Sequence, residues 1–300
     1  MTRSHPPTLF TLVTRTLREE CQLEPGSKLL LALSGGGDSM ALLHVLSSLR
    51  TKLNFQLTAL AVDHGLREQA AQELDLAEAF AGQLGVHLKR EKIQLHAGSN
   101  LQARAREARY GLLRRELEAE QADFLVTAHH AGDRAETVLE RLLRGAGPRG
   151  LAVLAPQDGN LLRPMIRADK PTVLSHLARH RIPFSNDPSN VDPRFLRVRI
   201  RNELLPLLSQ LSPGIVGHLN ALADQLAAGP PPVILDAGGQ PLLLGRSQLG
   251  QIQRAKRLGR SALSLRLRGD REVRLDAASG QLESAKSLAR PKKSKKSNSA

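Results

Sequence analysis

The chain has 300 residues; 41% are hydrophobic but only 2% are aromatic, so its core must rest on leucine, alanine, valine and isoleucine. Its net charge is +14, and residues 241–300 contribute +11 of it, with 15 lysines and arginines against 4 acidic residues. Such a charge indicates a polyanionic partner, most simply a nucleic acid. The alternative is that the basic residues form a tail that only increases solubility. The one cysteine, Cys21, excludes a disulfide framework or a cysteine zinc site, and no apolar run approaches the roughly 20 residues of a membrane span. These features predict a cytoplasmic protein without a membrane segment.

The first half of the chain alternates predicted strands with predicted helices. Residues 1–24 are expected to form a helix rather than a signal peptide, because their apolar pieces are short and acidic residues follow soon. The predicted strands, in chain order, are 28–33, 57–62, 86–93 and 124–127, and the helices that follow them are about 38–49, 67–84, 99–120 and 133–144. This alternation predicts an α/β fold with a parallel sheet and helices on both faces.

After residue 150 the pattern changes. Helices are predicted at 170–180 and 198–211, with a Pro/Asn/Asp-rich loop at 183–194 between them. His176 and His180 have the spacing of metal ligands on a helix, but no third ligand is evident, and a solvated helix face is the better interpretation. The expected organisation is an N-terminal helix at 1–24, an α/β domain at 25–165, a helical extension at 166–226, a linker at 227–232, a small basic β-rich module at 233–285 and a disordered Lys/Ser tail at 286–300.

Polar clusters follow three of the predicted strands, at 34–39, 63–67 and 127–133. Ligands of parallel α/β sheets bind beyond the carboxyl ends of the strands. Three such clusters at one sheet edge therefore predict a binding site there.

The first cluster is the sequence SGGGDS at 34–39. Its glycines let the backbone approach an anion closely, the serine hydroxyls can donate to phosphate oxygens, and a helix begins directly after them. The alternative is a tight turn that needs positive φ. No lysine follows the glycines, as a Walker A loop requires, and Met40 stands where the dinucleotide fingerprint needs glycine. Asp38 fits an anion site only if a metal ion mediates.

What remains resembles the PP-loop, SGGxDS, of the ATP pyrophosphatase superfamily, and further motifs resemble the tRNA(Ile)-lysidine synthetase family within it. These motifs are Asp63-His64-Gly65-Leu66-Arg67, Ala105-Arg106 with Arg109-Tyr110, Thr127-Ala128-His129-His130 with Asp133 and Glu136-Thr137, Arg144-Gly145-Ala146-Gly147, Arg163-Pro164, Asp187-Pro188-Ser189-Asn190, and Arg197 with Arg199-Ile200-Arg201 and Pro206. Val198 departs from the family pattern, which has asparagine there. The resemblance spans roughly 25–210 and implies an adenine nucleotide alpha hydrolase-like fold. It also implies that the domain at 25–165 is a PP-loop domain that binds ATP and that the helical extension at 166–226 completes the active site.

The resemblance also implies a two-step reaction. ATP activates the C2 carbonyl oxygen of the wobble cytidine in an isoleucine tRNA with a CAU anticodon, and pyrophosphate leaves. The ε-amine of free L-lysine then attacks C2 and displaces AMP. ATP and Mg²⁺ are the implied cofactors, tRNA and lysine are the implied partners, and a homodimer is an option that the sequence leaves open. The alternative is another PP-loop tRNA-modifying enzyme of the thiolase kind, which the lack of CxxC cysteines disfavours; a nonenzymatic RNA-binding protein is disfavoured by the intact motifs.

Five residues are expected to carry the chemistry. Asp38 is assigned Mg²⁺ binding or lysine orientation, and Asp133 is assigned the lysine ammonium. His129 lies four residues before Asp133 and would share its face if the helix starts that early, with a role in phosphate contact or proton transfer; a helix-cap role is the alternative. Arg109 and Arg201 are expected to meet carboxylate or phosphate groups. The expected nucleotide-binding residues are Ser34, Gly35, Gly36, Gly37, Asp38, Ser39, Asp63 and His64.

Overall fold

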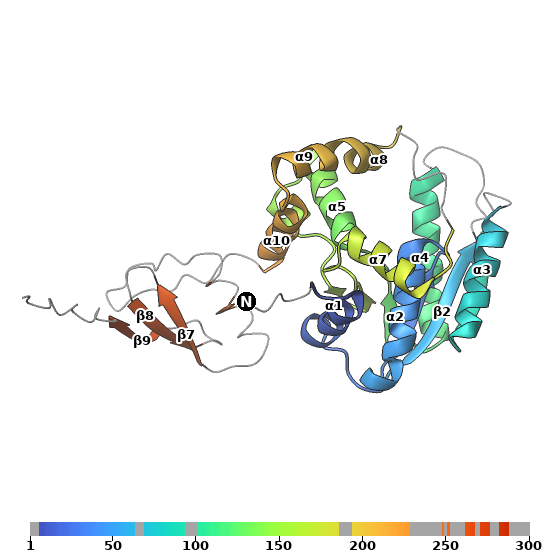
Figure 1. Ribbon diagram of the computed structural model, residues 1–300, viewed down its shortest axis with the longest axis horizontal. Helices are drawn as coiled ribbons and strands as arrows, with labels where there is room; N and C mark the ends of the chain where they lie inside the picture. Colours follow the sequence, from blue (N-terminus) through green and yellow to red (C-terminus); the bar gives the residue numbers. More distant parts are fainter. Residues whose placement is uncertain are drawn as a thin grey trace, which may run out of the picture. The chain divides into compact units, whose positions relative to one another are not determined.

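The computed structural model divides into two compact units, Met1–Ala227 and Ala228–Ala300, which we describe separately. The described residues are 6–63, 69–93, 101–185, 194–228, 248, 251–252, 262–267, 271–276 and 282–287. Figure 1 shows the helices and strands of both units. In this part of the chain, no helix combines the length and apolar character needed to cross a membrane.

A six-stranded sheet forms the centre of the first unit. Its strands are β1 (Lys28–Leu33), β2 (Gln56–Asp63), β3 (His87–Lys92), β4 (Phe124–Val126), β5 (Gln157–Asp158) and β6 (Leu161–Leu162). Their order is β3-β2-β1-β4-β6-β5, and every neighbouring pair is parallel except β5 and β6. The parallel sheet expected from the sequence is therefore confirmed, while the antiparallel β5–β6 hairpin is additional; its strands are two residues long and give no periodic signal.

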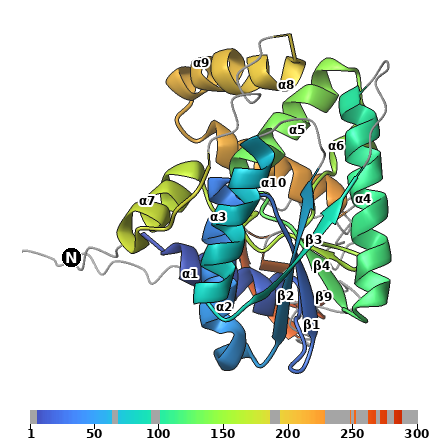
Figure 2. The ribbon, with the colours of Figure 1, turned by 90° about the vertical axis from the view of Figure 1, so that its right-hand side faces the viewer.

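Helices cover both faces of this sheet, as expected. The helices of the first unit are α1 (Leu9–Arg15), α2 (Gly37–Leu53), α3 (Gln69–Gln83), α4 (Leu101–Ala119), α5 (Ala131–Leu143), α6 (Pro148–Leu151), α7 (Lys170–His180), α8 (Leu196–Arg199), α9 (Leu205–Leu211) and α10 (Ile215–Ala227). Leu29 and Leu31 of β1 belong to the core cluster of α1, α2, α3 and α7, whereas Leu30 packs with Leu113 and Leu117 of α4. Successive strand residues point to opposite faces, so the continuous apolar run of β1 serves two cores. Figure 2 shows α4 on one side of the strands and α2 and α3 on the other.

The helix expected at 198–211 is interrupted. It begins at Leu196 as α8, widens into a π-helical turn at Ile200–Leu204, and continues as α9. Pro206 lies in the first turn of α9, where its missing N–H and its ring prevent regular α-helical bonding to the preceding turn. The N-terminal segment also contains a π-helical turn, Thr16–Glu20, directly after α1.

The second unit contains a three-stranded antiparallel sheet. Its strands are β7 (Ala262–Leu267), β8 (Arg271–Asp276) and β9 (Leu282–Ser287), in the order β7-β8-β9. β9 includes Lys286 and Ser287, which the sequence had placed in the disordered tail. The apolar stretch at 233–244 and the remaining tail, 288–300, lie outside the described residues.

His176 is buried, so the solvated helix face expected around it is wrong. Its Nε2 lies 3.1 Å from Nδ1 of His44 on α2, and its ring centroid lies 4.5 Å from that of His180 and 5.3 Å from that of Phe10. The α2–α7 interface is thus built partly from histidines. Burial, the neighbouring histidines and Arg179 lower the pKa of His176 to about 4.

This histidine cluster predicts a loss of stability in mild acid. Unfolded His176 regains a pKa near 6.5, so between pH 6.5 and 4 the unfolded chain binds more protons than the folded chain. The free energy of unfolding therefore falls as the pH falls through this window, by at most about 3 kcal/mol from this residue.

Urea unfolding followed by circular dichroism at pH 4.5 and 7 measures this difference in the free energy of unfolding. His176→Gln should reduce it by about 1–2 kcal/mol, whereas His87→Gln, at an exposed site, should leave it unchanged. An unaltered pH dependence in His176→Gln would contradict the cause assigned.

Candidate active site

The SGGGDS loop connects β1 to α2 and takes a conformation that requires glycine. Gly35 has φ +76°, and a Cβ there would lie 2.9 Å from the backbone oxygen of Glu73. The Ser34 and Ser39 hydroxyl oxygens are 3.1 Å apart, and Ser39 Oγ also donates to the Gly36 carbonyl at 2.9 Å. Gly36 caps α2 without a side chain. The N–H groups of the first turn of this helix can therefore serve an anion.

α7 and the segment after it hold this loop in place. A Cβ at Gly37 would lie 3.0 Å from Cδ1 of Leu177, so α7 packs directly against the start of α2. Ser185 donates its backbone N–H to the Gly35 carbonyl at 3.0 Å. The helical region after residue 165 thus supports the loop.

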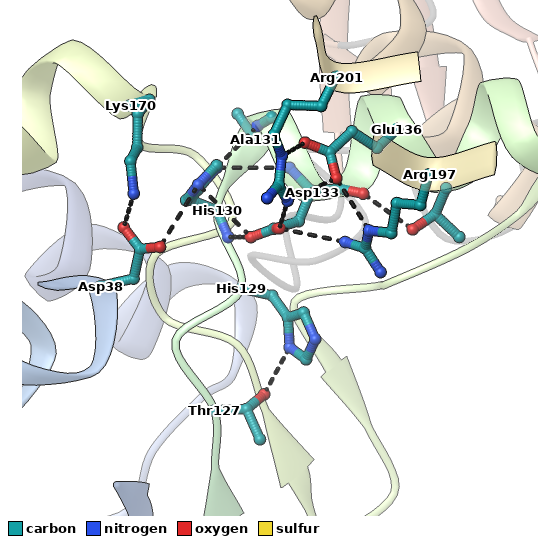
Figure 3. Close-up of polar contacts among 12 residues, drawn as sticks. Asp38, Thr127, His129, His130, Ala131, Asp133, Glu136, Lys170, Arg197 and Arg201 are labelled. Atoms are coloured by element: carbon teal, nitrogen blue, oxygen red, sulfur yellow. Dashed lines mark hydrogen bonds and ion pairs between the residues drawn. The ribbon is translucent and has the colours of Figure 1, made fainter. Parts of the chain in front are cut away.

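Asp38 lies between two basic groups (Figure 3). Its Oδ1 accepts a hydrogen bond from Nζ of Lys170 at 2.6 Å, and its Oδ2 lies 3.8 Å from Nε2 of His130. The same Nε2 lies 3.6 Å from Oδ2 of Asp133. The buried imidazole of His130 therefore stands between the carboxylates of the first and third polar clusters.

His130 is the N-cap of α5. Its Nδ1 accepts the backbone N–H groups of Gly132 at 3.0 Å and Asp133 at 3.3 Å, and Asp133 Oδ2 accepts the His130 N–H in return. Because Nδ1 accepts these bonds, the ring proton is assigned to Nε2, the nitrogen that faces Asp38 and Asp133.

His129 makes a different contact from that of His130. α5 begins at Ala131, so His129 and Asp133 do not share a helix face, and that expectation is wrong. The Nδ1 of His129 instead lies 2.9 Å from Oγ1 of Thr127, and Figure 3 shows the ring directed away from the Asp38–Asp133 line. His130 belongs to the motif recognised in the sequence but was not among the expected site residues; the pattern of a polar residue three positions before an acidic one, a capping box, was the available signal.

Asp133 is part of a partly buried ion-pair cluster with two arginines. Its Oδ1 lies 3.1 Å from Nη2 of Arg197 and 3.7 Å from Nη2 of Arg201. Glu136, one turn further along α5, accepts from Nε of Arg197 at 2.8 Å and from Nε of Arg201 at 2.6 Å. Burial opposes ionisation of Asp133, but the two adjacent histidines, the His130 N–H and Arg197 hold its pKa below the usual range. Asp133 is therefore charged at neutral pH.

The two arginines converge because they are four residues apart, on one side of the α8 and π-helical segment. Arg199 points elsewhere and pairs with Glu203 at 3.0 Å on the exposed side. The sequence had left open which of the three arginines enters the site, and the structure brings in Arg197 and Arg201. Hydrogen bonding to Glu136 raises the pKa of Arg201 despite its burial.

The other expected site residues lie elsewhere along the sheet edge or outside the described part. Leu33 of β1 pairs with Ala61 of β2, so Ser34 and Asp63 emerge from neighbouring strands at the same edge. His64 lies outside the described residues. Arg109 is on α4, with its guanidinium 5.6 Å from the Tyr110 ring centroid, and takes no part in the contacts given above.

The donor set at Asp38 suits a magnesium ion bound partly by a substrate. Among the described residues, no three His, Cys, Asp or Glu side chains are grouped to hold a metal ion. Mg²⁺ commonly binds through one or two carboxylates, with phosphate oxygens and waters completing its shell. A single loop carboxylate, Asp38, fits that pattern.

Comparison with known proteins agrees with this geometry. Residues 10–208 match the sequence model of the PP-loop domain. A curated tRNA(Ile)-lysidine synthase from Thermobifida fusca is 36% identical over 257 residues, which cover 79% of this chain and 79% of that protein. The chain belongs to the tRNA(Ile)-lysidine synthase family. The relative of the same name from Pseudomonas aeruginosa is 38% identical over 208 residues, 65% of this chain and 47% of that protein.

The chain thus spans about half the length of several curated relatives in this family. Among solved structures, the U34-tRNA thiolase NcsA from Methanococcus maripaludis, described with its [4Fe-4S] cluster, aligns with a TM-score of 0.62 at 20% identity. The alignment covers 74% of this chain and 80% of that one. At this identity the likeness concerns the fold alone.

Proposed function

We propose that this protein ligates free L-lysine to C2 of the wobble cytidine of an isoleucine tRNA with a CAU anticodon, at the cost of ATP converted to AMP and pyrophosphate. One observation carries the proposal. The PP-loop carboxylate Asp38 and the buried carboxylate Asp133 flank one imidazole, at 3.8 Å and 3.6 Å from its Nε2. The proposed nucleotide site and the proposed ammonium site would then be adjacent, as a reaction joining an activated base to an amine requires.

The first step is adenylation of the cytidine. The loop 34–39 and the first turn of α2 offer N–H and hydroxyl donors to the phosphates of ATP. The C2 oxygen attacks the α-phosphorus, and the bond between the α and β phosphates breaks to release pyrophosphate. Asp38 would hold Mg²⁺, which would neutralise charge on the departing pyrophosphate.

The second step is attack by lysine. Its ε-amine forms a bond to C2, and the bond between C2 and the oxygen carrying AMP breaks. Asp133 attracts the lysine ammonium from its position beside Arg197 and Arg201. We assign Arg201 to an anionic group of lysine or of AMP, and His129 to accept a proton from the amine. Arg109 is proposed to contact phosphate or carboxylate from α4.

A thiolase activity is the second candidate, and the cysteine chemistry opposes it. The one cysteine, Cys21, is buried, and its Sγ contacts the Pro156 carbonyl at 3.5 Å. Burial, first of all, and the neighbouring Glu20 raise the pKa of its thiol to about 12. Such a thiol is a poor nucleophile, and one cysteine cannot ligate an iron–sulfur cluster.

The protein is proposed to work in the cytoplasm and to assemble as a homodimer. The basic residues of 241–300 are proposed to contact the tRNA backbone. Backbone contacts by lysine and arginine add affinity without reading sequence. The chain spans 79% of the Thermobifida relative and about half of the Pseudomonas relative.

Product release tests the two-step scheme. Pyrophosphate should form from ATP only when the tRNA is present, and AMP should be released only when lysine is also present. Chromatography of labelled nucleotides measures both. Release of AMP that needs a sulfur donor and not lysine would contradict the proposal and favour the second candidate.

A further inference from the structure

Lys170 is a charged residue of the site that neither the sequence motifs nor the proposed mechanism uses. It is the first residue of α7, and its Nζ lies 2.6 Å from Oδ1 of Asp38 in the PP-loop (Figure 3). Its side chain is 46% exposed, so the ammonium has room to donate a hydrogen bond to another partner. An ammonium carries three donor hydrogens, and Asp38 takes one of them.

The position of Lys170 is built into the fold. Asp169 caps α7 by accepting the Thr172 N–H at 2.9 Å, and the same helix packs Leu177 against Gly37 of the loop. The first residue of α7 therefore reaches the first turn of α2, where Asp38 lies. A lysine fixed in this way is directed at the loop and not merely near it.

The anionic ligand proposed for this loop needs such a cation. The loop lacks the lysine that follows the glycines of a Walker A loop, and Asp38 adds a negative charge beside the phosphates. An ammonium that keeps its contact with Asp38 can donate at the same time to a phosphate oxygen on the loop. The pair would then stabilise a departing pyrophosphate more than an α-phosphate, since the PP-loop is proposed to hold the β and γ phosphates.

We propose that Lys170 is a pyrophosphate-binding residue: its ammonium bridges Asp38 and an oxygen of the β or γ phosphate of ATP. This rests on the proposed use of ATP by the loop. In the absence of nucleotide, Asp38 holds the ammonium in the place where it will be needed.

Binding of three ligands to the full chain tests this role without tRNA or lysine. Isothermal titration calorimetry measures the affinities for pyrophosphate, AMP and ATP. The wild type is compared with Lys170→Gln and Lys170→Arg. Lys170→Gln should weaken pyrophosphate and ATP binding by about 10-fold or more and leave AMP binding within about 2-fold. Lys170→Arg, which keeps the charge, should recover part of the loss. Lys52→Gln, an exposed residue in the last turn of α2, is the matched control and should bind all three like the wild type.

Equal weakening of AMP and pyrophosphate would contradict the proposal, because Lys170 would then only hold the loop in shape. Unchanged binding in Lys170→Gln would contradict it as well. A third result is that the wild type binds pyrophosphate in a way that depends on Lys170 and still never modifies tRNA. That result would overturn the proposed function and leave the role of Lys170 standing.

Discussion

Asp38→Asn will abolish tRNA-dependent release of pyrophosphate from ATP, with an expected loss of about 100-fold or more. The neutral amide would bind the proposed Mg²⁺ much more weakly than the carboxylate, and it would lose the ion pair that holds the ammonium of Lys170 at 2.6 Å. Both losses raise the energy of the transition state in which the pyrophosphate departs. A coupled phosphate assay after pyrophosphatase treatment measures the rate.

The control for this change is Asp75→Asn. Asp75 pairs with Arg90 at 2.7 Å on the exposed side of α3, away from the loop, so the same chemical change there should leave the rate unaltered. The assigned role of Asp38 fails if Asp38→Asn releases pyrophosphate at the wild-type rate.

Asp133→Asn is expected to block the second step selectively. In the wild type, the charges of Asp133 and Glu136 balance those of Arg197 and Arg201. Removing one negative charge leaves the cluster positive, which repels the lysine ammonium. Lysine transfer should fall by about 100-fold with a raised KM for lysine, while pyrophosphate release falls only a few-fold. Rapid-quench analysis of pyrophosphate and labelled lysine in the same reaction separates the two rates.

Glu203→Gln is the matched control for this prediction. Its carboxylate pairs with Arg199 at 3.0 Å on the exposed side of the same helical segment, and its loss should change neither rate. If Asp133→Asn slows both steps equally, the residue supports the fold of the site and does not select the ammonium.

The sheet could be predicted from the sequence because its central strands are continuous apolar runs. The run KLLLAL at 28–33 is buried on both faces, and such runs signal parallel strands without any partner being known. β5 and β6 have two residues each, too few for any period, and they were missed. The interruption before Pro206 was missed because helix-spaced leucines on both sides hid it.

That the loop and Asp133 lie at one edge of the sheet could be predicted, but their partners could not. Lys170 contacts Asp38 from 132 positions away, and Arg197 contacts Glu136 from 61 positions away. Spacing along the chain does not predict contacts between residues so far apart in the sequence. These contacts arise only when α7 and α8 pack against the other helices of the first unit. The contacts of His130 could not be predicted for a local reason: α5 begins at Ala131, about two residues earlier than expected, which makes His130 the N-cap.

The central claim is that this site joins lysine to a cytidine of tRNA. The most direct measurement incubates the protein with ATP, radiolabelled lysine and a transcript of isoleucine tRNA bearing a CAU anticodon, followed by digestion to nucleosides. The account predicts label in a single modified nucleoside derived from the wobble cytidine, and none when that cytidine is replaced by uridine. ATP consumption without any lysine entering the transcript would contradict it.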